Sequence, residues 1–319
     1  MNTPAKLSTF ALGLAVVLGA AAGIGHAVGP VGDTGKPAAH AGMQHDAKNG
    51  STEDEHSGHG AGAPADDVPG GLMISQHGYT LEPVNRVFHA GQPQDLAFVL
   101  RGPDGKPVTK YAATHEKDLH LIVVRRDLAD FIHVHPSLDA DGTWHYPLTL
   151  PAPGQYRMFT DFQPADGEGM TLGADISAAG DYQPAPLPAP SATYEIDGYT
   201  VTLDGKLEAG RTSKLTLSVS RDGKPVTDLQ PYLAAYGHLV ALRDGDLAYL
   251  HVHPEGAPGD GRTPAGPGIT FYVQAPTTGD YRLFMDFKHG DTVHTAAFTA
   301  HAAAPTGPAP AASETAHHH

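Results

Sequence analysis

The chain carries the same set of three histidines twice, with identical spacing, and histidine clusters of this kind bind transition metals. The first set lies in the segment HLIVVRRDLADFIHVHP, and its members are His120, His133 and His135. The second set lies 118 positions later, in HLVALRDGDLAYLHVHP, and its members are His238, His251 and His253. Clustered imidazoles are the usual protein ligands of zinc and copper. Most other positions of the two segments differ, which favours a shared role for the histidines.

Each segment has the pattern of a β-hairpin. In the second copy, Asp244-Gly245 is a favoured two-residue turn. That turn predicts a register with His238 opposite His251, and opposed residues share one face of a sheet. His253 lies two residues further on and points to the same face. The first copy has the same spacing, so the same register places His120 opposite His133 with His135 beside them.

A carboxylate repeats together with the histidines. Asp161 and Asp286 occupy the same place in the strands GQYRMFTDF and GDYRLFMDF. A buried carboxylate needs a partner, and three roles are open. It can be a direct ligand, it can hold a histidine through the second ring nitrogen, or it can pair with the neighbouring arginine, Arg157 or Arg282.

The ligand types indicate which metal the sites prefer. Imidazoles, with or without a carboxylate, suit Zn(II) or Cu(II). Met158 and Met285 do not occupy equivalent positions in the two repeats, so we expect them in the core rather than as thioether ligands of Cu(I). His115 and His145 have no histidine counterpart in the second repeat, and we expect both at the surface.

Composition excludes several function classes. Acidic residues outnumber basic residues 35 to 20, with a net charge of −15. Such a surface repels nucleic acids and anionic membranes and attracts cations. The chain has no cysteine, so disulfides, thiolate metal sites and thiol catalysis are excluded. No general base recurs in both repeats and no serine lies in a nucleophile elbow, so we do not expect an enzyme.

The amino terminus predicts export. Lys6 precedes the apolar run Phe10–Ile24, and small residues follow it, as in a signal peptide. An uncleaved membrane anchor is the alternative for residues 1–27. Residues 28–70 lack hydrophobic periodicity and predict a disordered linker, rich in acids and in histidines that can gather metal ions. We therefore expect a secreted or cell-envelope protein that touches a membrane only through an uncleaved amino-terminal segment.

From Leu72 onward, short runs rich in Val, Leu, Thr, Tyr and Phe alternate with Gly, Pro and Asp turns. The expected strands of the first unit are Gly78–Leu81, Asp95–Arg101, Leu119–Arg125, Phe131–Val134, Trp144–Leu150, Tyr156–Phe162 and Asp175–Ile176. This pattern predicts an all-β fold with two antiparallel sandwiches, because the segment DGKPVT also recurs, at positions 104 and 222. The strand GQYRMFTDF recurs as GDYRLFMDF at an offset of 125, which assigns seven extra residues to the loop after His253. The predicted units are sandwich 1 at 71–183, a Pro-rich linker at 184–193, sandwich 2 at 194–300 and a disordered tail at 301–319.

The histidine segments and the GQYRMFTDF and GDYRLFMDF strands resemble a group of exported actinobacterial proteins catalogued as uncharacterised or heavy-metal-binding. The two units also resemble YtkA-like domains, which are small bacterial immunoglobulin-like sandwiches. The resemblance covers roughly residues 72 to 300 and implies tandem immunoglobulin-like domains in an exported protein.

These observations lead to one principal hypothesis and two alternatives. The principal hypothesis is an envelope chaperone, buffer or resistance factor that binds copper(II) or zinc(II) at one histidine triad per domain. Its expected partners are metal ions and an envelope metal transporter or client metalloprotein. The alternatives are a structural or adhesion module without a metal, and a metalloenzyme that uses the open position of a three-histidine site.

Overall fold

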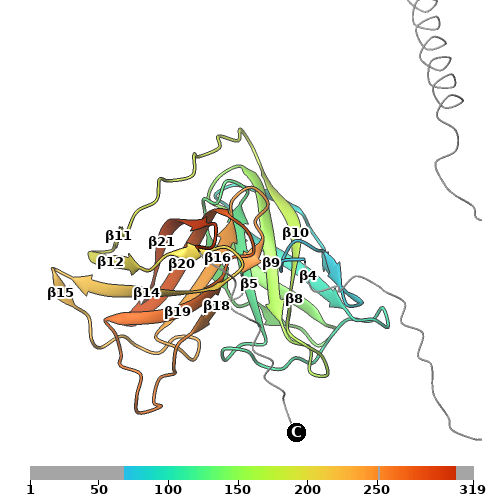
Figure 1. The fold of residues 1–319 in the computed structure, drawn as a ribbon. Helices are drawn as coiled ribbons and strands as arrows, with labels where there is room; N and C mark the ends of the chain where they lie inside the picture. Colours follow the sequence, from blue (N-terminus) through green and yellow to red (C-terminus); the bar gives the residue numbers. More distant parts are fainter. Residues whose placement is uncertain (1–67, 251, 307–319) are drawn as a thin grey trace, which may run out of the picture. The chain divides into compact units, whose positions relative to one another are not determined.

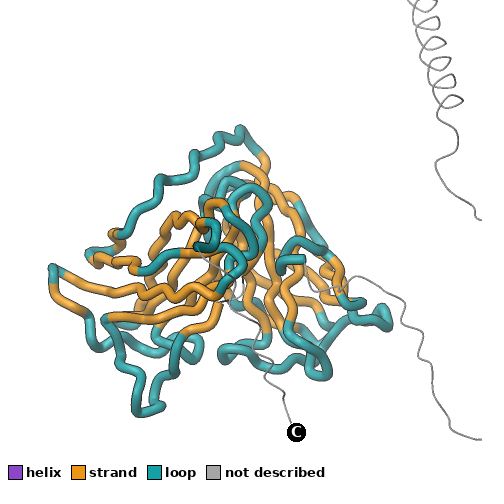
Figure 2. The backbone as a smooth tube through the Cα atoms, in the orientation of Figure 1, coloured by secondary structure: helices purple, strands orange, loops and turns teal. Residues whose placement is uncertain are grey.

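The computed structural model describes residues 68–250 and 252–306, and this part of the chain contains only strands and loops (Figure 2). Within it, there is no helix of the length and apolar character needed to cross a membrane. The predicted export signal and most of the predicted linker lie outside the described residues. His251 and the carboxyl-terminal histidines also lie outside them.

The first sandwich is built from two five-stranded sheets (Figure 1). One sheet has the order β1-β2-β4-β8-β7 and the other the order β3-β10-β9-β5-β6. β3 pairs in parallel with β10, and the other pairs are antiparallel. The strands are β1 (Ser75–Gln76), β2 (Tyr79–Pro83), β3 (Val87–His89), β4 (Pro93–Arg101), β5 (Leu119–Arg125), β6 (Ile132–Val134), β7 (Ser137–Leu138), β8 (Thr143–Thr149), β9 (Gly154–Phe162) and β10 (Met170–Ala179).

The second sandwich repeats this arrangement. Its sheets have the orders β11-β12-β14-β19-β18, with β15 beside β14, and β13-β21-β20-β16-β17. β13 again joins the last strand in parallel. The strands are β11 (Thr193–Ile196), β12 (Tyr199–Asp204), β13 (Leu207–Glu208), β14 (Thr212–Arg221), β15 (Lys224–Pro225), β16 (Gly237–Arg243), β17 (Tyr249–Leu250), β18 (Val252–Pro254), β19 (Gly268–Gln274), β20 (Gly279–His289) and β21 (Thr292–Ala303).

The two sandwiches are immunoglobulin-like, as the sequence predicted. Each starts its central strand with a tyrosine whose hydroxyl donates to a carbonyl four residues earlier: Tyr156 to Ala152 at 2.8 Å, and Tyr281 to Thr277 at 2.9 Å. This tyrosine corner is a hallmark of immunoglobulin-like sandwiches. Each sandwich has its own apolar core between its sheets, and the expected core methionines lie in these cores.

A third apolar cluster joins the outer faces of the two sandwiches. It combines side chains of β5 and β9 with side chains of β16 and β20, and its buried members are Ile122, Val124, Leu128, Phe159, Val240, Leu242, Leu247, Tyr249 and Phe284. Phe131 stacks on Phe284 with ring centroids 4.0 Å apart. The equivalent pair, Tyr249 and Phe159, lies 5.7 Å apart, so the interface has approximate two-fold symmetry. Each hairpin is apolar on both faces because one face packs in the core of its own sandwich and the other face packs in the interface cluster.

The predicted hairpin register is wrong by two residues in both repeats. His133 lies opposite Ile122 rather than His120, and Leu242 lies opposite Tyr249 rather than Leu247. The turns are longer because a leucine with positive φ, Leu128 or Leu247, folds its side chain into the interface cluster. A shift of two residues keeps every side chain on its face, so the histidines still point the same way.

Two predicted boundaries also need correction. Residues 68–70 belong to the structured part, because the Gly70 carbonyl accepts the Tyr249 amide at 2.9 Å across the interface. The neighbouring Gly71 has φ +73°, and a Cβ there would lie 2.4 Å from Phe159, so this segment needs glycine to lie flat on the sheet. At the other end, β21 continues to Ala303 because Ala302 pairs with Leu207, so residues 301–303 are not part of a disordered tail.

The tyrosine corners predict a measurable contribution to stability. We expect Tyr156→Phe and Tyr281→Phe each to lower the free energy of unfolding by about 1 kcal/mol, because each removes a largely buried hydrogen bond. Denaturant unfolding measures the effect. Tyr272→Phe is the control, since it removes only an exposed bond to Glu255. Equal losses in all three variants would contradict a specific role for the corners.

Candidate metal centre

His120 lies on β5 with its side chain turned toward the second sandwich. The residue is 1% exposed. Its Nε2 is 3.0 Å from the carbonyl oxygen of Thr114. A carbonyl only accepts hydrogen bonds, so Nε2 carries the proton and Nδ1 of the neutral ring holds a lone pair. Nδ1 is therefore the atom of His120 that is able to bind a metal.

His133 lies on β6 and is fixed by the other sandwich. Its Nδ1 donates to Oδ2 of Asp286, on β20, at 2.7 Å, and the two side chains are 2% and 4% exposed. This bond leaves the lone pair of the neutral ring on Nε2. Carboxylates hold metal-binding histidines in this way, because the bond sets the tautomer and makes the ligand more basic. The second oxygen, Oδ1, accepts the hydroxyl of Thr295 at 2.6 Å.

Three ring nitrogens converge at one point. Nδ1 of His120 lies 3.2 Å from Nε2 of His133 and 3.2 Å from Nε2 of His135. Zinc–nitrogen bonds of about 2.0–2.1 Å in a tetrahedral site place ligand atoms about 3.3 Å apart. The three expected histidines of the first repeat are thus brought together at metal-ligand spacing.

The contact between His120 and His133 suits a metal ion. With both tautomers fixed by Thr114 and Asp286, two lone pairs face each other at 3.2 Å. A metal ion between the rings removes this repulsion. Burial lowers the pKa of His120 to about 4 and, together with the nearby His133, the pKa of His135 to about 3. Both rings are therefore neutral at pH 7 and available as ligands.

His238 of the second sandwich completes the wall of the centre. Its ring lies parallel to His120 at 5.4 Å and 4.8 Å from the ring of His133. Its buried Nδ1 has no hydrogen-bond partner among the described residues, and burial lowers the pKa of this ring well below its usual value. His133, His238 and Asp286 form a second group at metal-ligand spacing. His238 and Asp286 therefore face the first domain across the interface.

His115 is part of this cluster, although the sequence predicted a surface position. Its ring lies 5.8 Å from His120 and 5.6 Å from His238. The aligned residue of the second repeat, Leu233, is buried, and that apolar counterpart was the available signal. His145 does lie at the surface, bonded to Asp95 on the outer sheet.

Asp161 sits opposite His120 in the ladder of β5 and β9, as Asp286 sits opposite His238. It accepts Thr171 Oγ1 at 3.3 Å and the Tyr249 hydroxyl at 3.5 Å, so its contacts also cross the interface. Arg157 donates to Asp175 and to the Gly71 carbonyl. Asp161 belongs to neither of the two groups of described side chains that lie at metal-ligand spacing.

The second triad stays a prediction. His251 lies outside the described residues, and so does the side chain of His253. The backbone of His253 belongs to β18, where it pairs with Tyr272 of β19. The returning strand of the second repeat thus reaches the opposite sheet earlier than the returning strand of the first.

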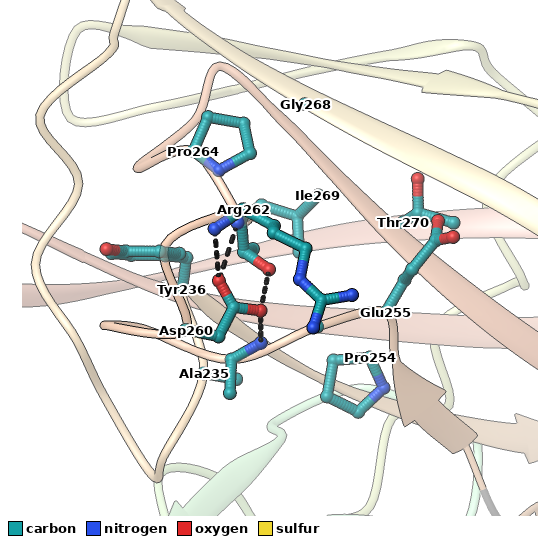
Figure 3. Close-up of a pocket in the computed structure, with 13 residues that line it drawn as sticks. Ala235, Tyr236, Pro254, Glu255, Asp260, Arg262, Pro264, Gly268, Ile269 and Thr270 are labelled. Carbon is teal, nitrogen blue, oxygen red and sulfur yellow. Dashed lines mark hydrogen bonds between the residues drawn. The ribbon is translucent and has the colours of Figure 1, made fainter.

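A cavity of the second sandwich lies beside the loop that carries the extra residues (Figure 3). Asp260 organises this loop, since its carboxylate accepts the Ala257, Arg262 and Thr263 amides and the Thr263 hydroxyl. These bonds lower the pKa of Asp260 well below its usual range. These bonds are internal to the loop and explain its shape. The histidine cluster, and not this cavity, is therefore the candidate site.

The two sandwiches match one family model, described as a domain of unknown function (DUF8832), at residues 74–180 and 194–304. The chain belongs to the DUF8832 family. The tandem repeat expected from the sequence is thereby confirmed. The description of this family does not mention a metal. No curated protein matches this DUF8832 chain.

Solved structures that match part of this chain include surface proteins of bacteria. The Escherichia coli adhesin FdeC is 16% identical over 72% of this chain and 65% of its own, with a TM-score of 0.24. The Yersinia pseudotuberculosis adhesin InvE is 16% identical over 72% and 60%, also with a TM-score of 0.24. A two-domain fibronectin type III segment of chicken tenascin is 12% identical over 69% and 97%, with a TM-score of 0.21. The DUF8832 chain thus spans less than two thirds of both adhesin chains, and scores this low carry no functional argument.

The lowered pKa values predict how acid destabilises the metal-free protein. Unfolded histidine binds protons near pH 6.5, whereas folded His120 and His135 bind them only near pH 4 and 3. The unfolded state therefore takes up more protons as pH falls from about 6.5 to 3, and stability falls through this window. Urea unfolding at pH 7, 5.5 and 4 measures the slope.

His135→Gln should flatten this slope relative to the wild type. His145→Gln is the control and should steepen it, because the bond to Asp95 raises the pKa of His145. An unchanged slope in His135→Gln would contradict the assignment of a buried, neutral ring.

Proposed function

We propose that the protein binds one transition metal ion, Cu(II) or Zn(II), through Nδ1 of His120 and Nε2 of His133 and His135. One observation carries the proposal: two imidazole lone pairs, each fixed by a partner of its own, face each other at 3.2 Å. A metal ion would accept both lone pairs, and Nε2 of His135 lies equally close to His120. The chemistry of the donor set suits either ion.

The arrangement favours metal binding without catalysis. Three histidines would leave one coordination position for an exchangeable ligand. Asp286 of the second domain is engaged by His133 and Thr295, so it orients a ligand and does not serve as a general base. Together with the predicted export, this supports the role of an envelope metal chaperone, buffer or resistance factor. A metal transporter or client metalloprotein would then be the partner.

A structural or adhesion module without a metal is the second candidate. The observation that favours it is the apolar interface, in which Phe131 stacks on Phe284 at 4.0 Å. Burial of such side chains holds two domains together without an ion. In that case the histidines would serve the interface.

Metal titration of the full chain separates the two candidates. We expect one tight equivalent of Cu(II) or Zn(II) by calorimetry, weakened by more than about 100-fold in His133→Ala, because that change removes a ligand. His145→Ala is the matched control and should bind as the wild type does. The amino-terminal histidines are present in every variant, so they contribute a common background.

The opposite result would favour the structural module. In that case no tight equivalent would appear in the wild type, or His133→Ala and His145→Ala would bind equally well. The prediction of a second centre at His238, His251 and His253 is tested in the same titration by a second equivalent that the corresponding triple alanine variant removes.

A further inference from the structure

We infer that the metal centre of the first sandwich is completed by the second sandwich, so that metal affinity and the docking of the two domains are coupled. The inference rests on the proposed function and extends it from binding to regulation. The ligand nitrogens come from one domain, and the groups that orient and enclose them come from the other. The affinity for a metal ion at this centre would therefore depend on whether the two domains are docked.

The orienting contact is the hydrogen bond from His133 to Asp286. It joins β6 of the first domain to β20 of the second at 2.7 Å, with both side chains almost fully buried. The ring of an undocked His133 would lose this acceptor. Both tautomers would then be populated, and one of them places a proton on the nitrogen that should bind the metal.

The enclosing contact is the ring of His238, which lies parallel to His120 at 5.4 Å. Undocking would remove this ring from above the centre and expose His120 to water. Docking thus supplies both the orientation and the enclosure of the ligands.

Docking can be disturbed without unfolding either domain. The interface cluster includes Val240 and Leu242, whereas the neighbouring Leu239 and Ala241 belong to the core of the second sandwich. Leu242 is four residues from His238, about 13 Å along the strand. Charges at Val240 and Leu242 would keep the interface open, because each would otherwise be buried without a partner.

The coupling has an expected size. Loss of a group that orients a ligand typically weakens metal binding by about 10- to 100-fold. Linkage requires the reciprocal effect, so bound metal should favour the docked state by the same factor. Bound metal would then stabilise the docked domains, and docking would strengthen metal binding.

The experiment compares Zn²⁺ affinity in full-length variants, each with a matched control. Asp286→Asn removes the orienting carboxylate, and its control Asp280→Asn changes an exposed aspartate of the same strand that also bonds a histidine, His301. The double variant Val240→Asp/Leu242→Asp opens the interface, and its control is Val293→Asp on the exposed side of β21. Circular dichroism verifies that every variant is folded.

Docking is followed in the same samples by electron paramagnetic resonance, which measures the distance between two spin labels. The chain has no cysteine, so nitroxide labels at Gln92→Cys and Lys224→Cys, one on each domain, report only the interdomain distance. We expect a narrow distribution in the wild type and in Asp286→Asn. The open variant should give a broad distribution that narrows when Zn²⁺ is added.

Both variants should bind Zn²⁺ about 10- to 100-fold more weakly than the wild type, with both controls unchanged. The result that overturns the inference is an open variant, or Asp286→Asn, with wild-type affinity. That outcome leaves the proposed function standing, because metal still binds. Failure of the wild type to bind Zn²⁺ or Cu(II) would instead remove the proposed function and the coupling with it.

Discussion

The hydrogen bond between Asp286 and His133 is the contact on which the candidate site depends. A carboxylate buried this deeply is stable only with donors on its oxygens, and here one donor comes from its own sheet and the other from the neighbouring domain. The bond also determines which nitrogen of His133 is free. A buried carboxylate of the second domain thus sets the tautomer of His133 in the first domain.

The approximate two-fold symmetry of the interface explains how such a contact arises. Two copies of one sandwich that pack through the same hairpin face bring each copy's strand aspartate toward the other copy's hairpin. The symmetry is incomplete in chemical terms. Phe131 stacks closely on Phe284, whereas its counterpart Tyr249 extends a hydroxyl toward Asp161, so the two halves present different donors to equivalent carboxylates.

Much of the fold followed from local pattern. β5 was predicted to the residue and β4, β8 and β9 to within two at each end, because apolar alternation and Gly, Pro and Asp turns delimit them. β10 was predicted only over Asp175–Ile176, since its small residues carry little strand signal. The turn register failed because the burial of Leu128 and Leu247 depends on the other domain. The convergence of His120, His133 and His135 survived that error, since a two-residue shift preserves the face.

The composite nature of the site was not predictable from local pattern, because His133 and Asp286 are far apart in the chain and no periodicity links them. The available signal was the hairpin itself, which is apolar on both faces and therefore needs a second partner. The apolar counterpart of His115, Leu233, was a signal of the same kind. In both cases the missing information was the neighbouring domain.

The short segment at Gly70 and Gly71 has a consequence for the order of folding. Its carbonyl accepts the amide of Tyr249, and nearly the whole first sandwich, together with the linker, lies between these two residues in sequence. During synthesis from the amino terminus, this one bond must wait for the second domain's hairpin, whereas Gly71 already pairs with Thr171 and Arg157 of its own domain. Contacts of such long sequence separation form late and slowly. The bond between Gly70 and Tyr249 therefore forms only when the two domains dock.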